Sequence, residues 1–174
     1  MPLSLHEASI PVFIRALENL SAQLEKGRAF ADERGIPHAE LLNARLFEDM
    51  APLTAQIQRA SDTAKGTAVR VGRVENVPME DKEDSFDALQ DRIARTLAFL
   101  RAVPAEAMEG REDAEVEFTA RGNTILFTGR SYVLTFALPN FFFHATTAYD
   151  LLRHMGVPVG KMDFLGAIGA PARG

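Results

Sequence analysis

His144 is the residue whose type and spacing best suit chemistry. It belongs to a row of apolar residues at steps of three and four, which predicts that its imidazole points into a helical interior. The other members of the row are Phe141, Ala148, Leu151 and Met155. A neutral imidazole in that position can bind a metal ion or act as a general base. A buried histidine that only forms a hydrogen bond with a glutamine, a threonine or a backbone carbonyl explains the same pattern.

Polar residues from two segments are candidates to complete a site around His144. Asn140 lies about one helical turn before it and shares its face. Gln56, Gln58 and Asp62 lie on an earlier helical segment. With His144 and Asp62 as metal ligands, these residues would form a weak oxygen and nitrogen site for a divalent ion such as Zn²⁺ or Ni²⁺. Helix capping and solvation account for the same residues without any site.

The other histidines do not extend this set to a three-histidine metal site. His6, His38 and His154 form neither an HExxH nor a His-x3-His pattern with one another or with His144. His154 follows His144 by ten residues, which turns its side chain well away from the inward face. A three-histidine site is therefore not supported by the spacing.

Tyr149 and Arg153 form a pair one turn apart on the segment that carries His144. Packing of the guanidinium against the ring explains this pair, and anion binding by Arg153 is the alternative. Together with His144, Asn140 and Gln58, the pair supplies the expected lining of a site for a small apolar or anionic molecule.

Long helical segments are expected to position these residues. The first is expected over about 9–34, with Ser9 as N-cap and Pro11 in the first turn; a start at the capping box Ser4-x-x-Glu7, with a kink at Pro11, is the alternative. Further helices are expected over about 38–47, 52–71, from Ser85, and 139–155. The inward rows are Leu41, Leu42 and Leu46; Leu53, Ile57, Ala60 and Ala64; and Phe86, Leu89, Ile93, Leu97, Leu100 and Val103.

Residues 115–136 differ in composition from the helical segments. Segments 115–119, 124–128 and 132–136 are rich in β-branched and aromatic residues and are separated by turn residues. They predict two or three short antiparallel strands before the last helix. After that helix, the run 160–166 contains Lys161 and Asp163, and we expect it to fold back on the helices as a structural clasp.

Composition limits the possible functions and locations. The 174 residues carry a net charge of −5 and show no basic cluster, so a nucleic-acid partner is not expected. The absence of cysteine excludes disulfides, thiolate metal sites and a cysteine nucleophile. No basic and apolar leader or long apolar run occurs, which predicts a cytoplasmic protein without membrane spans. One domain over residues 1–174 accounts for the whole chain.

Several blocks of sequence resemble a bacterial family with the label DUF1993, for domain of unknown function. The most specific are residues 139–157 (Pro-Asn-Phe-Phe-Phe-His-Ala-Thr-Thr-Ala-Tyr-Asp-Leu-Leu-Arg-His-Met-Gly-Val) and residues 160–166 (Gly-Lys-Met-Asp-Phe-Leu-Gly). Residues 11–20 and 53–65 agree with it, so that the resemblance spans nearly the whole chain.

This resemblance implies a mainly helical fold similar to the DinB/YfiT-like superfamily. That fold is a four-helix bundle, up-down-down-up and often dimeric, here with a short β-hairpin or three-strand insertion before the last helix. Many members of the superfamily bind a divalent metal through three histidines, and some are thiol-dependent transferases or isomerases. In this sequence only His144 matches that histidine pattern, because residues 140 and 148 are Asn and Ala.

Three functions are therefore open. The first is a degenerate metal-binding enzyme centred on His144. The second is a non-catalytic protein that binds a small ligand. The third is a structural homodimer that associates through additional apolar positions such as Ile14, Phe142 and Phe143. A homodimer is also compatible with either of the first two functions.

Overall fold

The computed structural model describes residues 3–120 and 122–169. The protein is mainly helical, with one antiparallel two-stranded hairpin. The long helices are α1 (Leu5–Arg34), α3 (Leu53–Gly72), α4 (Phe86–Arg101) and α6 (Leu138–His154). The shorter elements are α2 (His38–Leu42), η1 (Ala105–Met108), β1 (Glu115–Ala120), β2 (Asn123–Thr128), α5 (Gly129–Ser131), η2 (Tyr132–Ala137) and α7 (Lys161–Leu165).

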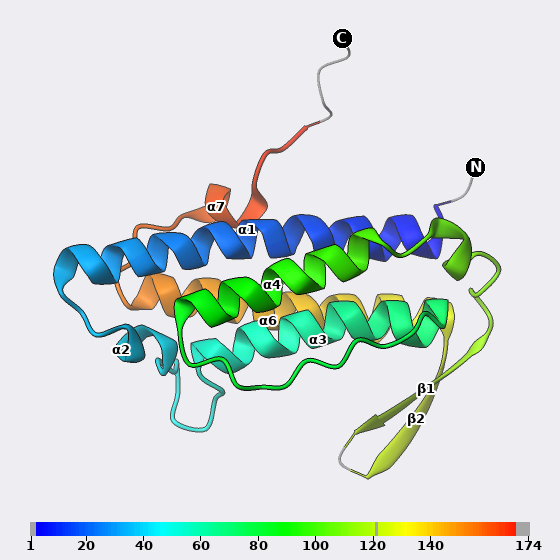
Figure 1. Ribbon diagram of the computed structural model, residues 1–174. Coiled ribbons are helices and arrows are strands. Elements are labelled where there is room, and N and C mark those ends of the chain that lie inside the picture. The colour runs from blue at the N-terminus through cyan, green and yellow to red at the C-terminus, as the bar shows by residue number, and fades with distance from the viewer. Residues whose placement is uncertain (1–2, 121, 170–174) are drawn as a thin grey trace.

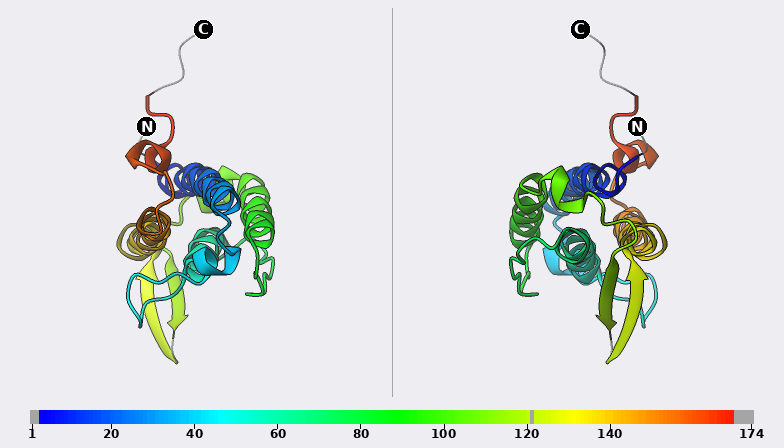
Figure 2. Two further views of the ribbon diagram at one scale, coloured as in Figure 1. Left: turned by 90° about the vertical axis from the view of Figure 1, so that its left-hand side faces the viewer. Right: turned by 90° about the vertical axis from the view of Figure 1, so that its right-hand side faces the viewer.

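The four long helices pack lengthwise around a common apolar core. α1 lies against α4 and α6, and α3 lies against the same two helices from the other side (Figure 2). α1 and α6 run in one direction and α3 and α4 in the other (Figure 1). Because α3 and α4 are parallel, the segment 73–85 between them returns along the whole length of α3. In the part of the chain that the structure describes, every helix is too short or too polar to span a membrane.

The first helix begins earlier than the primary expectation. Ser4 is its N-cap and forms a capping box with Glu7, so the expected start at Ser9 is wrong and the alternative start is confirmed. Pro11 lies inside the helix. Ser9 is buried, and its hydroxyl donates to the Leu5 carbonyl at 2.6 Å. The capping box prevails because it satisfies backbone N–H groups that a start at Ser9 would leave outside the helix.

The later helices follow their expected positions closely. The expected inward rows of α3 and α4 are buried, including Val103 just beyond the end of α4. The Ser85 hydroxyl accepts a hydrogen bond from the Ala88 amide, as expected for an N-cap. The second segment is shorter than expected, because helix α2 ends at Leu42 and Leu46 is 38% exposed.

Segment 132–136 is helical, so the possibility of a third strand is wrong. Strands β1 and β2 pair from Glu115↔Thr128 to Ala120↔Asn123, and η2 follows as a six-residue π-helix. Thr128 and Ser131 form a capping box that starts helical structure directly after β2. Tyr132, Val133 and Ala137 are buried, whereas Leu134 and Thr135 are exposed, a spacing that suits a helix better than a strand. Tertiary packing thus overrides the β propensity of these residues.

The expected clasp is present as helix α7, which lies along α1 (Figure 1). Lys26 contacts the Asp163 carboxylate at 2.7 Å, and the Asn19 side chain donates to the Phe164 carbonyl at 3.0 Å. Asp163 also accepts a hydrogen bond from the Gly160 amide at 2.8 Å, which caps the short helix. Lys161, in contrast, is exposed.

Candidate functional site

His144 is buried between α6 and α3, as its spacing predicts. Its side chain is 7% exposed, and Nδ1 lies 2.7 Å from Oε1 of Gln56, which is itself 1% exposed. The Gln56 amide nitrogen donates to the Ala51 carbonyl at 2.9 Å, so the amide oxygen must face the imidazole. An amide oxygen only accepts hydrogen bonds, and Nδ1 of His144 therefore carries the proton.

This arrangement leaves Nε2 of His144 as an acceptor. Nε2 has no hydrogen-bond partner among the described residues. Nε2 is also not fully buried. In the same part of the chain, the side-chain atoms that are both fully buried and without a hydrogen-bond partner are Gln23 Oε1 and Arg111 Nη2, and Nε2 is not among them. Burial, with a smaller contribution from the positive charge of Arg59, lowers the pKa of His144 to about 4. The imidazole is therefore neutral at pH 7 and offers its Nε2 lone pair.

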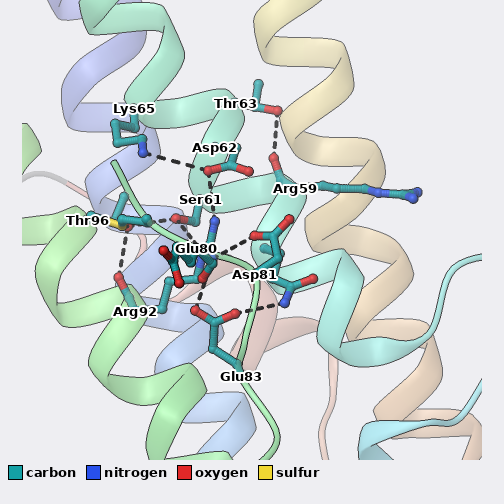
Figure 3. Close-up of polar contacts among 12 residues, drawn as sticks. Arg59, Ser61, Asp62, Thr63, Lys65, Glu80, Asp81, Glu83, Arg92 and Thr96 are labelled. Atoms are coloured by element: carbon teal, nitrogen blue, oxygen red, sulfur yellow. Dashed lines mark hydrogen bonds and ion pairs between the residues drawn. The ribbon is translucent and has the colours of Figure 1, made fainter. Parts of the chain in front are cut away.

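Asn140 extends the polar contact between these helices by one turn. Its side-chain nitrogen donates to the Thr63 hydroxyl at 2.8 Å, and that hydroxyl donates to the Arg59 carbonyl at 2.7 Å. Gln56 and Thr63 are seven residues apart and lie on one face of α3. The structure therefore brings Asn140 and His144 together with this face, and the guanidinium of Arg59 extends from it across α6 (Figure 3).

Gln58 and Asp62 lie on the other side of α3. The Gln58 amide donates to Glu83 at 2.7 Å, and Asp62 contacts Arg92 of α4 at 2.8 Å. Figure 3 shows Asp62 directed toward α4, whereas Thr63 is directed toward α6. Two residues after Gln56 correspond to a rotation of about 200° on a helix, which explains why Gln58 faces away from His144. The expected grouping of Gln58 and Asp62 with His144 therefore does not form.

These two residues belong instead to a cluster around Arg92, which we call the Arg92 cluster. The Arg92 side chain is 1% exposed and contacts Asp62, Asp81 at 2.9 Å and Glu83 at 3.0 Å. Its Nε donates to the Ser61 hydroxyl at 3.2 Å. Burial opposes ionisation of Glu83, but hydrogen bonds from Gln58 and Arg92 outweigh it and lower the pKa of this carboxyl.

The Arg92 cluster holds the 73–85 segment against α3 and α4 (Figure 3). Lys65 adds a bond from its ammonium to the Val77 carbonyl at 2.7 Å. Glu83 lines two open clefts, one of 470 Å³ beside α4 and one of 290 Å³ beside α2 and α3. The Glu83 carboxylate already accepts hydrogen bonds from Arg92 and Gln58, so these contacts tie the segment to α3 and α4.

Tyr149 and Arg153 do not form the expected pair. The Tyr149 ring packs edge-on against Phe164 of α7, with ring centroids 5.9 Å apart. Arg153 is exposed and lies over no aromatic ring of the described residues. Tyr149 thus helps to seat the clasp, and the pair does not line a site with His144.

The described residues do not fit a three-ligand metal centre. No group of three or more His, Asp or Glu side chains in residues 3–120 and 122–169 is arranged to hold a metal ion. His144 faces Gln56, a neutral amide that is already bonded at both ends. Asp62, the second expected ligand, contacts Arg92 instead.

Sequence reasoning missed the importance of Arg92, although a signal was present. Arg92 comes three residues after Leu89 and directly before Ile93, within the buried face of its helix. An arginine there needs several acceptors, because burying an unpaired charge is very costly. The acidic run at residues 80–84 was a visible source of them.

Comparison with known proteins agrees with this architecture. A family model described as "Domain of unknown function (DUF1993)" matches residues 5–165. The crystal structure of a DinB family member protein from Shewanella denitrificans is 34% identical in sequence, with a TM-score of 0.87, and the match covers 97% of this chain and 96% of that chain. No curated protein matches. The chain therefore belongs to the DUF1993 family and shares its fold with a DinB family protein.

Proposed function

We propose that this protein is a non-catalytic, DinB-like four-helix bundle that binds a small polar ligand at His144. In this proposal α1, α3, α4 and α6 are the bundle and the shorter elements are additions to it. The observation that carries the proposal is the orientation of His144 by Gln56, which leaves Nε2 as an acceptor that is not fully buried. An oriented, neutral imidazole suits a ligand that carries an N–H or O–H group.

Arg59 adds a preference for ligands that also carry negative charge. It is exposed, has no acidic partner among the described residues, and influences His144 electrostatically. No hydroxyl, carboxylate or second imidazole of the described residues contacts His144 Nε2. The described residues therefore place no activated nucleophile or general acid beside His144, which favours binding over catalysis.

The test compares thermal unfolding of the wild type, His144→Gln and His154→Gln with a panel of hydroxy acids and amino acids. His154 is exposed on the same helix and is the matched control. A ligand at about 100 times its Kd is expected to stabilise the wild type and His154→Gln by about 2.7 kcal/mol and to have little effect on His144→Gln. Equal responses of all three proteins would refute the proposal.

The same proteins distinguish ligand binding from metal binding at His144. Elemental analysis after incubation with Zn²⁺ or Ni²⁺ is expected to show no stoichiometric metal that depends on His144. Retention of one ion per chain by the wild type, and its loss in His144→Gln, would replace ligand binding by metal binding at this site.

A homodimer remains a separate proposal, favoured by Phe143, which is 57% exposed on α6. Its neighbours in the expected dimer face are less available, since Ile14 is partly buried and Phe142 packs near Phe164 with ring centroids 6.5 Å apart. Light scattering of the wild type is expected to give the mass of two chains, and Phe143→Ser the mass of one. A monomeric wild type at high concentration would exclude the homodimer.

A further inference from the structure

Arg70, in the last turn of α3, is a half-buried arginine with no acidic partner in the described part of the chain. No carboxylate of the described residues lies within ion-pair distance of it. Its guanidinium lies 5.1 Å from the ring centroid of Phe118, and its Nη1 donates to the Tyr132 hydroxyl at 3.2 Å. Arg92 is the opposite case in the same protein, because three carboxylates surround it.

The surrounding structure holds this guanidinium in place. Gly66 lies one turn earlier on α3, and a Cβ added there would come within 2.2 Å of Arg70 Nη1. The side chain therefore folds back over the bare glycine. Tyr132 is fully buried at the start of the π-helix η2, where its ring packs against Phe127 and Phe136. π-Helical turns are rare and are frequently found at functional sites.

One edge of the guanidinium, formed by Nε and Nη2, is unpaired among the described residues and is not fully buried. Nε and Nη2 of Arg70 donate to no described residue. These two nitrogens are also not among the fully buried side-chain atoms without a partner, which for the described residues are Gln23 Oε1 and Arg111 Nη2. Partial burial of an uncompensated charge costs free energy, and an incoming anion would recover part of it. Nε and Nη2 form the edge that pairs with two oxygens of one oxyanion.

We infer that Arg70, positioned by Gly66, Phe118 and Tyr132, is an oxyanion-binding site for a small molecule with a carboxylate or phosphate group. The site is independent of the proposed ligand at His144, because it uses the other end of α3 and the hairpin. Because the protein carries a net charge of −5, nonspecific electrostatic attraction would not explain the binding of an anion at Arg70.

The test follows the backbone amide resonances of Phe118 and Tyr132, which contact Arg70 and are present in every variant, by ¹⁵N NMR during titration with sodium acetate and, separately, sodium phosphate at constant ionic strength. Gly66→Ala is the key variant, because it retains every charge and requires only the end of the Arg70 side chain to move. Arg70→Gln removes the cation, and Arg73→Gln removes an exposed arginine three residues away as the matched control.

Wild type and Arg73→Gln are expected to bind at least one of the two anions with similar affinity, within about twofold, because exposed charges are screened. Gly66→Ala and Arg70→Gln are expected to raise the Kd about tenfold or more, because the loss of hydrogen bonds to a charged group usually weakens affinity by at least this factor. Selective binding of acetate or of phosphate identifies the group.

The absence of a saturable shift with both anions, or equal affinities in wild type and Gly66→Ala, would overturn the site. If Arg70→Gln unfolds, Arg70→Lys provides the same comparison, since lysine keeps the charge but loses the two-pronged edge and is expected to bind more weakly than arginine.

Discussion

The imidazole of His144 on α6 and the side-chain amide of Gln56 on α3 are joined by a hydrogen bond of 2.7 Å, buried from solvent. The amide is fixed from its other end by the Ala51 carbonyl. One pair of residues therefore connects two long helices and selects the tautomer of the histidine, whose second nitrogen has no partner in residues 3–120 and 122–169.

Replacing Gln56 by Leu is expected to destabilise the fold by about 1–3 kcal/mol, because a buried polar atom of His144 loses its partner. Urea denaturation measures this change. Thr146→Ala, an exposed substitution on α6, is expected to change the free energy of unfolding by less than about 0.5 kcal/mol. A change for Gln56→Leu as small as this control would mean that the hydrogen bond contributes nothing to stability.

Stability is expected to depend on pH through His144. Its pKa of about 4 in the folded protein lies below the ordinary value of 6.5, so the unfolded chain binds more protons between these values. The contribution is complete above about pH 6.5 and is lost as the pH falls toward 4. At 1.36 kcal/mol per pH unit, its full size is about 3 kcal/mol.

The measurement is the difference in unfolding free energy between wild type and His144→Gln at several pH values from 4 to 7.5. Titration of the carboxylates is common to both proteins and cancels. The difference is expected to grow in favour of the wild type as the pH rises. Parallel stability curves would show that His144 is protonated as easily in the folded protein as in the unfolded chain.

Arg92→Met is expected to destabilise the protein by about 3–5 kcal/mol, because it leaves Glu83 buried without its cation. Hydrogen exchange should accelerate first in residues 73–85, since Arg92 holds this segment against α3 and α4. Arg95→Gln is the control, because Arg95 is half-exposed and lies 3.7 Å from Asp91. Its loss is expected to cost less than about 1 kcal/mol.

Gly166→Ala is expected to detach helix α7 from α1. Gly166 has a φ of +68°, which disfavours alanine, and an added Cβ would lie 2.4 Å from the Asn19 side chain. A cost of about 1–3 kcal/mol is expected from the backbone alone, because a φ of 68° with a ψ of −161° is a conformation that essentially only glycine adopts. Limited proteolysis should then cut near residues 160–166 faster than in the wild type. Gly160→Ala is the control, because no atom of the described residues lies within 4 Å of a Cβ at that position. Equal cleavage rates in both variants would show that Gly166 is not needed for the clasp.

Sequence patterns were sufficient for much of the helical architecture. The apolar rows of α3, α4 and α6 repeat at helical spacing over several turns, and the Ser85 cap and the Gly156 and Pro158 stop mark two of the ends. The inward direction of His144 followed from the same periodicity. The β propensity of residues 132–136 led to the wrong prediction of a strand. In a short segment, residue propensity is weaker than packing, here that of Tyr132 and Phe136 against the hairpin.

The sequence by itself determined which residues face inward on each helix, because helical periodicity is a local property of the chain. It did not determine which inward residues meet. Gln56 and Gln58 are two residues apart, yet one contacts His144 on α6 and the other contacts Glu83 beside α4. Only the tertiary structure decided this, since the neighbour of each face of α3 depends on how helices distant in the chain are arranged around it.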